Sequence, residues 1–134
     1  MQNKFSLLIV DRNPRIRNFL KREFQSEGYN VQLAKNGKEL MDLIYSSVSI
    51  DLVIIDPDIP DVNPPNLFKC LENRIPELPV VIHGYSSDDI ESSWRLRTAM
   101  FIPKRGSSSE ALKGVIRELI MKSYPKRFNT VIHP

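Results

Sequence analysis

Two aspartates and one lysine stand where short apolar runs of the chain end, and they are its best candidates for chemistry. The run 52–55 is followed by Asp56-x-Asp58, the run 5–10 ends on Asp11, and Lys104 follows the run 100–102. In an open α/β sheet, ligands bind at the carboxyl ends of the strands, so Asp56 would lie at the reactive edge. A solvated aspartate that begins a turn would give the same local pattern, so Asp56 alone does not decide the question.

The elements that would position these residues form a regular alternation. We expect strands at 5–10, 29–33, 52–55, 79–82 and 100–102, and helices at 14–28, 37–44, 66–74, 86–94 and from the capping box Ser107-x-x-Glu110 to residue 120. This (βα)5 pattern predicts an α/β fold, a doubly wound parallel sheet with helices on both faces. In the order 2-1-3-4-5 the first and third strands are neighbours. Asp11 and Asp56 would then converge, and Lys104 could reach the same edge.

Composition narrows the class of protein. With 134 residues the chain is long enough for one domain, which we place at 1–122, followed by a tail or linker at 123–134. The net charge of +3 is mild and the bases are dispersed, which does not indicate nucleic-acid binding. There is no apolar run of membrane-spanning length and no signal peptide, so we expect a cytoplasmic domain without membrane contact.

The chain resembles the receiver domain of two-component response regulators over about residues 4–122. Three motifs carry the resemblance: Leu8-Ile9-Val10-Asp11, Asp56-x-Asp58-Ile59-Pro60 and Phe101-Ile102-Pro103-Lys104. Each motif is short, but their order, spacing and placement at strand ends make the joint match specific.

The resemblance implies a role for each matching residue. Asp56 would accept a phosphoryl group from a histidine kinase or phosphotransfer protein, and Lys104 would pair with that group. Asp11, Asp56 and the backbone carbonyl of Asp58 would be ligands of Mg²⁺. Phosphoryl transfer depends mainly on positioning and charge neutralisation. The resemblance implies a phosphoacceptor signalling domain and not an enzyme. Phe101 matches the family's switch aromatic, and Trp94 is a candidate anchor on the output face.

Several positions depart from the family pattern. Arg12 stands where a second acid usually binds the metal. The usual Ser or Thr falls on His83 or Gly84, depending on a one-residue gap, and neither carries a hydroxyl. Pro64-Pro65 and Arg105 also replace the usual residues. The site charge of Asp11, Asp56, Arg12 and Lys104 sums to zero, so we expect weakened Mg²⁺ binding, with Arg12 either paired to an aspartate or pointing into solvent.

Two uses of this fold remain open. One is a phosphoacceptor switch whose output surface extends from the fourth strand to the fifth helix and meets an effector domain, a partner protein or, in a homodimer, a second copy. The other is a phosphorylation-independent pseudo-receiver that acts as a protein-interaction module. A haloacid-dehalogenase phosphatase is disfavoured by Pro60, and a flavodoxin-like protein by Asp11-Arg12-Asn13-Pro14 in place of a phosphate-binding loop. His83 and His133 are too few and too far apart for a zinc site.

Overall fold

The computed structural model describes residues 5–74, 77–85, 100–106 and 108–132, and for residues 130–132 it describes the backbone only. Along the chain the elements are β1 (Ser6–Val10), α1 (Pro14–Ser26), β2 (Asn30–Ala34), α2 (Gly37–Ile44), β3 (Leu52–Ile55), α3 (Pro64–Glu72), β4 (Val80–Gly84), β5 (Met100–Pro103), α4 (Ser108–Ser123) and α5 (Pro125–Ile132). The helix expected at 86–94, Trp94 and Ser107 lie outside the described residues.

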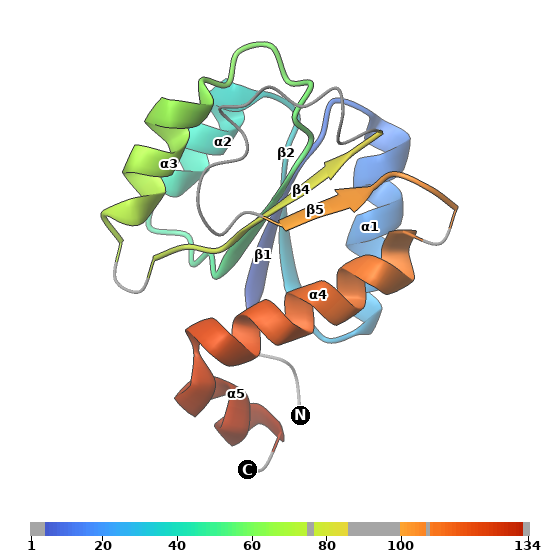
Figure 1. Cartoon of the computed structure of the whole chain (residues 1–134), viewed down its shortest axis with the longest axis vertical. Helices are drawn as coiled ribbons and strands as arrows, with labels where there is room; N and C mark the ends of the chain where they lie inside the picture. Colours follow the sequence, from blue (N-terminus) through green and yellow to red (C-terminus); the bar gives the residue numbers. More distant parts are fainter. Residues whose placement is uncertain (1–4, 75–76, 86–99, 107, 133–134) are drawn as a thin grey trace.

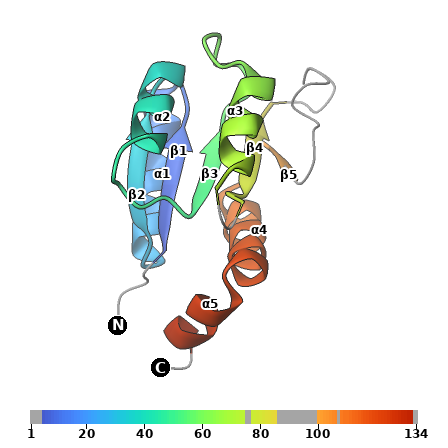
Figure 2. The same ribbon diagram turned by 90° about the vertical axis from the view of Figure 1, so that its left-hand side faces the viewer.

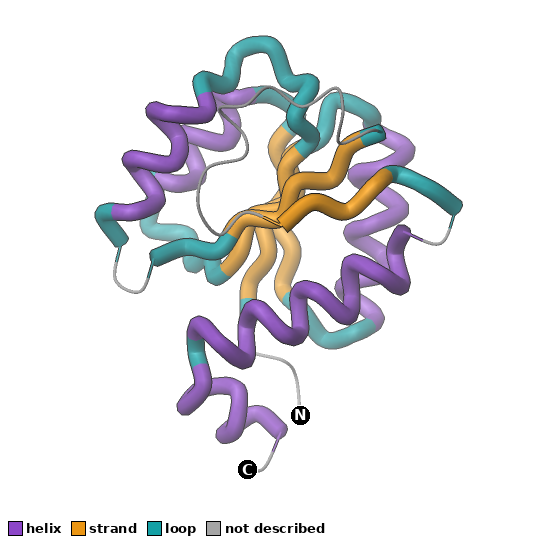
Figure 3. Tube along the Cα trace, in the orientation of Figure 1, coloured by secondary structure: helices purple, strands orange, loops and turns teal. Residues whose placement is uncertain are grey.

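The strands form one parallel sheet in the order β2-β1-β3-β4-β5, which confirms the predicted topology. Helices α2 and α3 cover one face, and α1 and α4 cover the other, so that the sheet is the middle of three layers (Figures 1 and 3). The central strands are buried on both sides because each face needs its own apolar surface.

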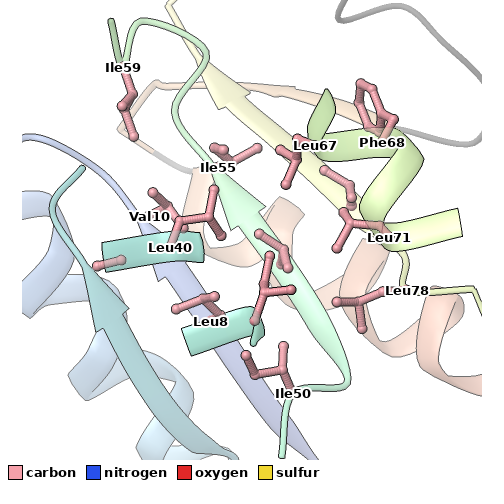
Figure 4. Packing of buried hydrophobic residues seen from close by; sticks show 14 of the residues in the cluster. Leu8, Val10, Leu40, Ile50, Ile55, Ile59, Leu67, Phe68, Leu71 and Leu78 are labelled. Atoms are coloured by element: carbon pink, nitrogen blue, oxygen red, sulfur yellow. The ribbon is translucent and has the colours of Figure 1, made fainter. Parts of the chain in front are cut away.

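Alternate residues of the central strands feed two separate cores. Leu8 and Val53 point into the core under α2 and α3, whereas Leu7 and Leu52 point into the core under α1 and α4. Figure 4 shows the first of these cores, with Val10 and the other labelled side chains packed between the sheet and the two helices. Two-sided burial explains why residues 7–10 in β1 and the whole of β3 are apolar and do not alternate with polar residues.

Polar caps set the starts of three helices. Asn13, Asn36 and Asn63 accept hydrogen bonds from backbone amides of α1, α2 and α3 through their side chains. Proline opens α1, as the sequence predicts, because its fixed φ suits the first turn. Gly28 follows α1 with a φ of 92°, a conformation that favours glycine after a helix.

The structure moves the start of one helix and adds another. Pro64 and Pro65, expected in the loop, form the first turn of α3, where a missing amide proton costs nothing. Strand β4 continues through His83 and Gly84, where its ladder with β5 extends, in agreement with the strand end expected near these two residues. The tail predicted at 123–134 contains the helix α5, which the sequence analysis did not foresee.

Helix α5 lies beyond the amino-terminal edge of the sheet, below α4 (Figures 1 and 2). Arg127 reaches back from α5 to Asp51 just before β3, with nitrogen–oxygen distances of 2.8 and 3.2 Å. The hydroxyl of Tyr124 donates to the carbonyl oxygen of Asp51 at 2.7 Å, and the Arg127 guanidinium lies over the ring of Phe5. Within the described part of the chain, no helix is long and apolar enough to cross a membrane.

Candidate functional site

The three predicted residues meet at the carboxyl edge of the sheet. Asp11, Asp56 and Lys104 are each the first residue after a strand, and each backbone amide continues the parallel ladder. Their amide nitrogens donate to the carbonyl oxygens of Ala34, Val10 and Gly84 at 3.1, 2.8 and 2.6 Å, respectively. The sheet register therefore fixes the backbone positions from which the three side chains project.

Lys104 lies between the two carboxylates. Its Nζ is 2.9 Å from Oδ2 of Asp11 and 3.4 Å from Oδ2 of Asp56. All three side chains are almost entirely buried, with at most 6% of their surface exposed. A shared cation at this depth offsets the cost of desolvating two negative charges.

Each aspartate uses its two oxygens differently. Oδ1 of Asp11 accepts from the amide of Asn13 at 2.8 Å, and Oδ1 of Asp56 accepts from the amide of Asp58 at 2.9 Å. These contacts are tight turns in which an aspartate bonds the backbone two residues ahead. Oδ2 of each residue is thereby turned toward Lys104. Burial raises the pKa of Asp11 above its usual value, although the Asn13 amide and Lys104 act in the opposite direction.

Arg12 lies beside the same oxygen of Asp56. Its Nε is 3.8 Å from Oδ2 of Asp56, and 55% of its side chain remains exposed to solvent. Oδ2 of Asp56 therefore faces two cations, Lys104 from the floor of the site and Arg12 from the rim. Sequence reasoning missed a second arginine: Arg17 donates from one guanidinium nitrogen to the carbonyl oxygens of Asp11 and Arg12 at 2.7 and 3.0 Å. It holds the loop between β1 and α1 in place.

His83 and Gly84, the two candidates for the family's Ser or Thr position, have different surroundings. The His83 side chain is buried on the face covered by α4, and its Nε2 lies 3.2 Å from Oγ of Ser108. Burial and the charge of Lys104 lower the pKa of His83 to about 4, so the imidazole is neutral at physiological pH. At Gly84 an added Cβ would meet Cγ of Pro57 at 2.8 Å, so the present backbone has no room for a side chain.

The two remaining candidates are the proposed switch and interaction aromatics. Phe101 is partly buried in the core under α2 and α3, and its ring edge would lie 3.4 Å from a Cβ at Gly84. Trp94 lies outside the described residues. Tyr85, which the sequence analysis did not select, has its ring centroid 5.0 Å from Nζ of Lys104. It lines an open depression of about 270 Å³ above the site, together with Asp11, Arg12, Asn13, Asp56 and Lys104.

Comparisons with known proteins identify the family of the chain. The family model for the response regulator receiver domain matches residues 7–116. The chain belongs to the receiver family. It is 32% identical over 76 residues to the response regulator MprA of Mycolicibacterium vanbaalenii, which covers 57% of this chain and 32% of that protein. It is 28% identical over 120 residues to the transcriptional regulatory protein CpxR of Escherichia coli, covering 88% of this chain and 50% of CpxR.

Solved receiver structures share the fold. The response regulator TrrA of Thermotoga maritima, solved in complex with Mg²⁺ and BeF, superposes with a TM-score of 0.72 at 27% identity, covering 86% of this chain and 98% of that one. TrrA has also been solved in complex with the histidine kinase ThkA. The chain spans between a third and half of the curated response regulators described above.

Receiver domains typically bind Mg²⁺, and in this chain the two carboxylates at the matching site are paired with basic side chains. Mg²⁺ prefers a set of oxygen ligands and retains several waters. Here the two carboxylates already face Lys104 and Arg12, and the formal charge of the four side chains is zero. Among the residues that the structure describes, no three His, Cys, Asp or Glu side chains gather into a metal-binding group. The receiver site of this chain is thus charge-balanced by its own side chains.

Proposed function

We propose that this receiver domain accepts a phosphoryl group on Asp56 from a histidine kinase or phosphotransfer protein in the cytoplasm, with a weakened need for Mg²⁺. The observation that carries the proposal is the position of Oδ2 of Asp56 between Nζ of Lys104 at 3.4 Å and Nε of Arg12 at 3.8 Å. Two cations around one carboxylate oxygen can neutralise the charge of an incoming phosphoryl group.

The chain's residues would divide the work of the transfer. Oδ2 of Asp56 attacks phosphorus while the bond to the donor nitrogen breaks, and that nitrogen keeps the electron pair and takes a proton from solvent. Oδ1 stays bound to the amide of Asp58, which keeps Oδ2 pointed at the donor. Lys104 and Arg12 pair with the phosphoryl oxygens. The arginine keeps its charge at any physiological pH, so its share does not depend on a bound ion.

Acetyl phosphate tests the proposal directly. The protein is incubated with this donor, with Mg²⁺ or with EDTA, and weighed intact. We expect the mass of one added phosphoryl group in both conditions, and Asp56→Asn should abolish it. A strict requirement for Mg²⁺ would contradict the weakened dependence. Absence of the adduct from wild-type protein, with acetyl phosphate and with a phosphorylated partner protein, would contradict phosphorylation itself.

A charge-reversing variant isolates the contribution of Arg12. Arg12→Asp removes a cation beside Asp56 and restores an acid, and two unit charges about 4 Å apart interact by about 4 kcal/mol at an effective dielectric constant of 20. We expect Mg²⁺ to bind Arg12→Asp at least tenfold more tightly than wild type, roughly 1.4 kcal/mol, in titrations followed by calorimetry. Arg15→Asp, an exposed site on α1, makes the same charge change and is the matched control. Equal affinities in all three proteins would contradict the role of Arg12.

The pseudo-receiver is the second candidate, and Gly84 favours it. Gly84 is one of the two positions that match the family's Ser or Thr. It has no room for a side chain, because Pro57 fills the space. The chain would then serve as a protein-interaction module whose binding does not depend on phosphate. In either case we place the output surface between β4 and α4, with Phe101 on it, as the contact for an effector domain, a partner protein or a second copy. A partner that binds wild type and Asp56→Asn equally, with or without acetyl phosphate, would identify the pseudo-receiver.

A further inference from the structure

The acceptor oxygen lies at the bottom of a depression whose rim is exposed. Asp56 itself is only 3% exposed, and the Lys104 side chain only 6%. Two rim residues are far more open: Arg12, at 55%, and Tyr85, at 63%. Within the described part of the chain, an arginine that follows β1 and a tyrosine that follows β4 thus both line the depression that leads to Oδ2 of Asp56.

The backbone of Tyr85 is held in place by the preceding residue. The carbonyl oxygen of Gly84 accepts the amide of Lys104 at 2.6 Å, which ties the end of β4 to the end of β5. On its other side, Gly84 packs so closely against the ring of Pro57 that a Cβ would not fit. The backbone from which the Tyr85 side chain projects is thus fixed next to the site.

The positive charge of Lys104 attracts the ring of Tyr85 toward the site. Its centroid lies 5.0 Å from Nζ of Lys104, within the range in which an aromatic face attracts an ammonium group. Lys104 in turn is anchored by Asp11 and Asp56. The ring of Tyr85 and the ammonium of Lys104 therefore lie in contact at the wall of the same depression.

We propose that Tyr85 is a specificity-determining residue whose ring narrows the approach to Oδ2 of Asp56 and admits donors by their bulk. A donor that is narrow next to its phosphoryl group can reach Oδ2 of Asp56. A donor that is wide there is blocked by the ring of Tyr85. This inference rests on the proposed function only in taking Oδ2 of Asp56 as the atom that a donor must reach. Access itself can be measured without phosphorylation.

A thiol placed at the acceptor position measures access. Asp56→Cys is made in a Cys70→Ser background, because Cys70 is the only native cysteine. The alkylation rate of the introduced thiol is then measured with iodoacetamide and with a bulky aryl maleimide. We expect Tyr85→Ala to raise both rates several-fold, with the larger increase for the maleimide. Tyr85→Phe should keep the rates of the parent, because it retains the ring.

Matched controls separate access from loosened structure. Tyr45→Ala removes another exposed tyrosine, 74% open and located at the end of α2, and should leave both rates unchanged. Rates that do not change in Tyr85→Ala, or that rise equally in Tyr85→Ala and Tyr85→Phe, would overturn the proposal. So would an equal rise for the small and the bulky reagent. The acetyl phosphate experiment on Asp56 gives a separate answer, so the proposed function and this inference can fail independently.

Discussion

At the scale of single residues, His83 links the site to the stability of the domain. Its pKa falls from 6.5 to about 4 because the imidazole is buried and lies near the positive charge of Lys104. Between these two pH values, His83 is protonated in the unfolded chain but neutral in the folded protein. Stability is therefore highest above pH 6.5 and is lost as the pH falls toward 4, by up to about 3 kcal/mol for this group.

His83→Gln removes this titration while it keeps a polar group near Ser108. We expect the free energy of unfolding of the variant, relative to wild type, to rise as the pH is lowered from 6.5 to about 4. Urea unfolding at a series of pH values measures the difference, and other acidic groups cancel because both proteins share them. His133→Gln replaces the other histidine and serves as control. A constant difference across the pH range would show that His83 titrates alike in both states.

The sequence predicted the three charged residues at the strand ends because each follows an uninterrupted apolar run. The strand order alone is enough to predict that Asp11, Asp56 and Lys104 lie close together. Tyr85 could not be predicted in the same way, because its role depends on where its ring packs and not on a spacing. His83 and Gly84 could not be distinguished until the strand register assigned each position to a face of the sheet.

At the scale of elements, the close contact between β4 and the loop after β3 predicts a cost for restoring a hydroxyl. In Gly84→Ser the new Cβ would lie 2.8 Å from Cγ of Pro57, whose ring cannot fold away. We expect the substitution to lower the free energy of unfolding by about 1–3 kcal/mol, as overpacking does. In a Pro57→Ala background the same substitution should cost less, since the obstructing ring is gone.

Urea unfolding of the four proteins of this cycle isolates the coupling between the two positions. Gly106→Ser is the matched control, because a Cβ at Gly106 would meet no atom within 4 Å. An equal cost of Gly84→Ser in both backgrounds would show that Pro57 is not the obstacle.

At the scale of the whole molecule, polar groups gather at both ends of the sheet. The candidate site lies at the carboxyl edge, and the contact between Asp51 and α5 lies at the amino edge. Helix α5 was missed from the sequence because its eight residues begin with proline and contain basic residues, a composition also typical of linkers. Its position depends on contacts with Phe5 and Asp51, which are distant in sequence and which no local pattern reveals.

Arg127→Ala tests whether α5 is an integral part of the domain. The substitution leaves the buried carboxylate of Asp51 with the amide of Ser6, 2.8 Å away, but without its cation. Because the Arg127 side chain is 46% exposed, solvent screens part of the loss, and we expect a cost of about 1–3 kcal/mol in urea unfolding. Lys122→Ala, an exposed base at the end of α4, should cost less than about 0.5 kcal/mol.

The same variant should leave the opposite edge of the sheet unchanged, because the contacts of Asp56 described above come from β1, β5 and the adjoining loops and not from α5. Labelling of Asp56 by acetyl phosphate should therefore proceed at the wild-type rate in Arg127→Ala under conditions where the protein is folded. Adding Asp51→Asn should recover part of the lost stability, since the uncompensated charge is then removed. If Arg127→Ala were as stable as wild type, the ion pair would contribute nothing to the docking of α5. If it altered labelling, the two ends of the sheet would be coupled through β3.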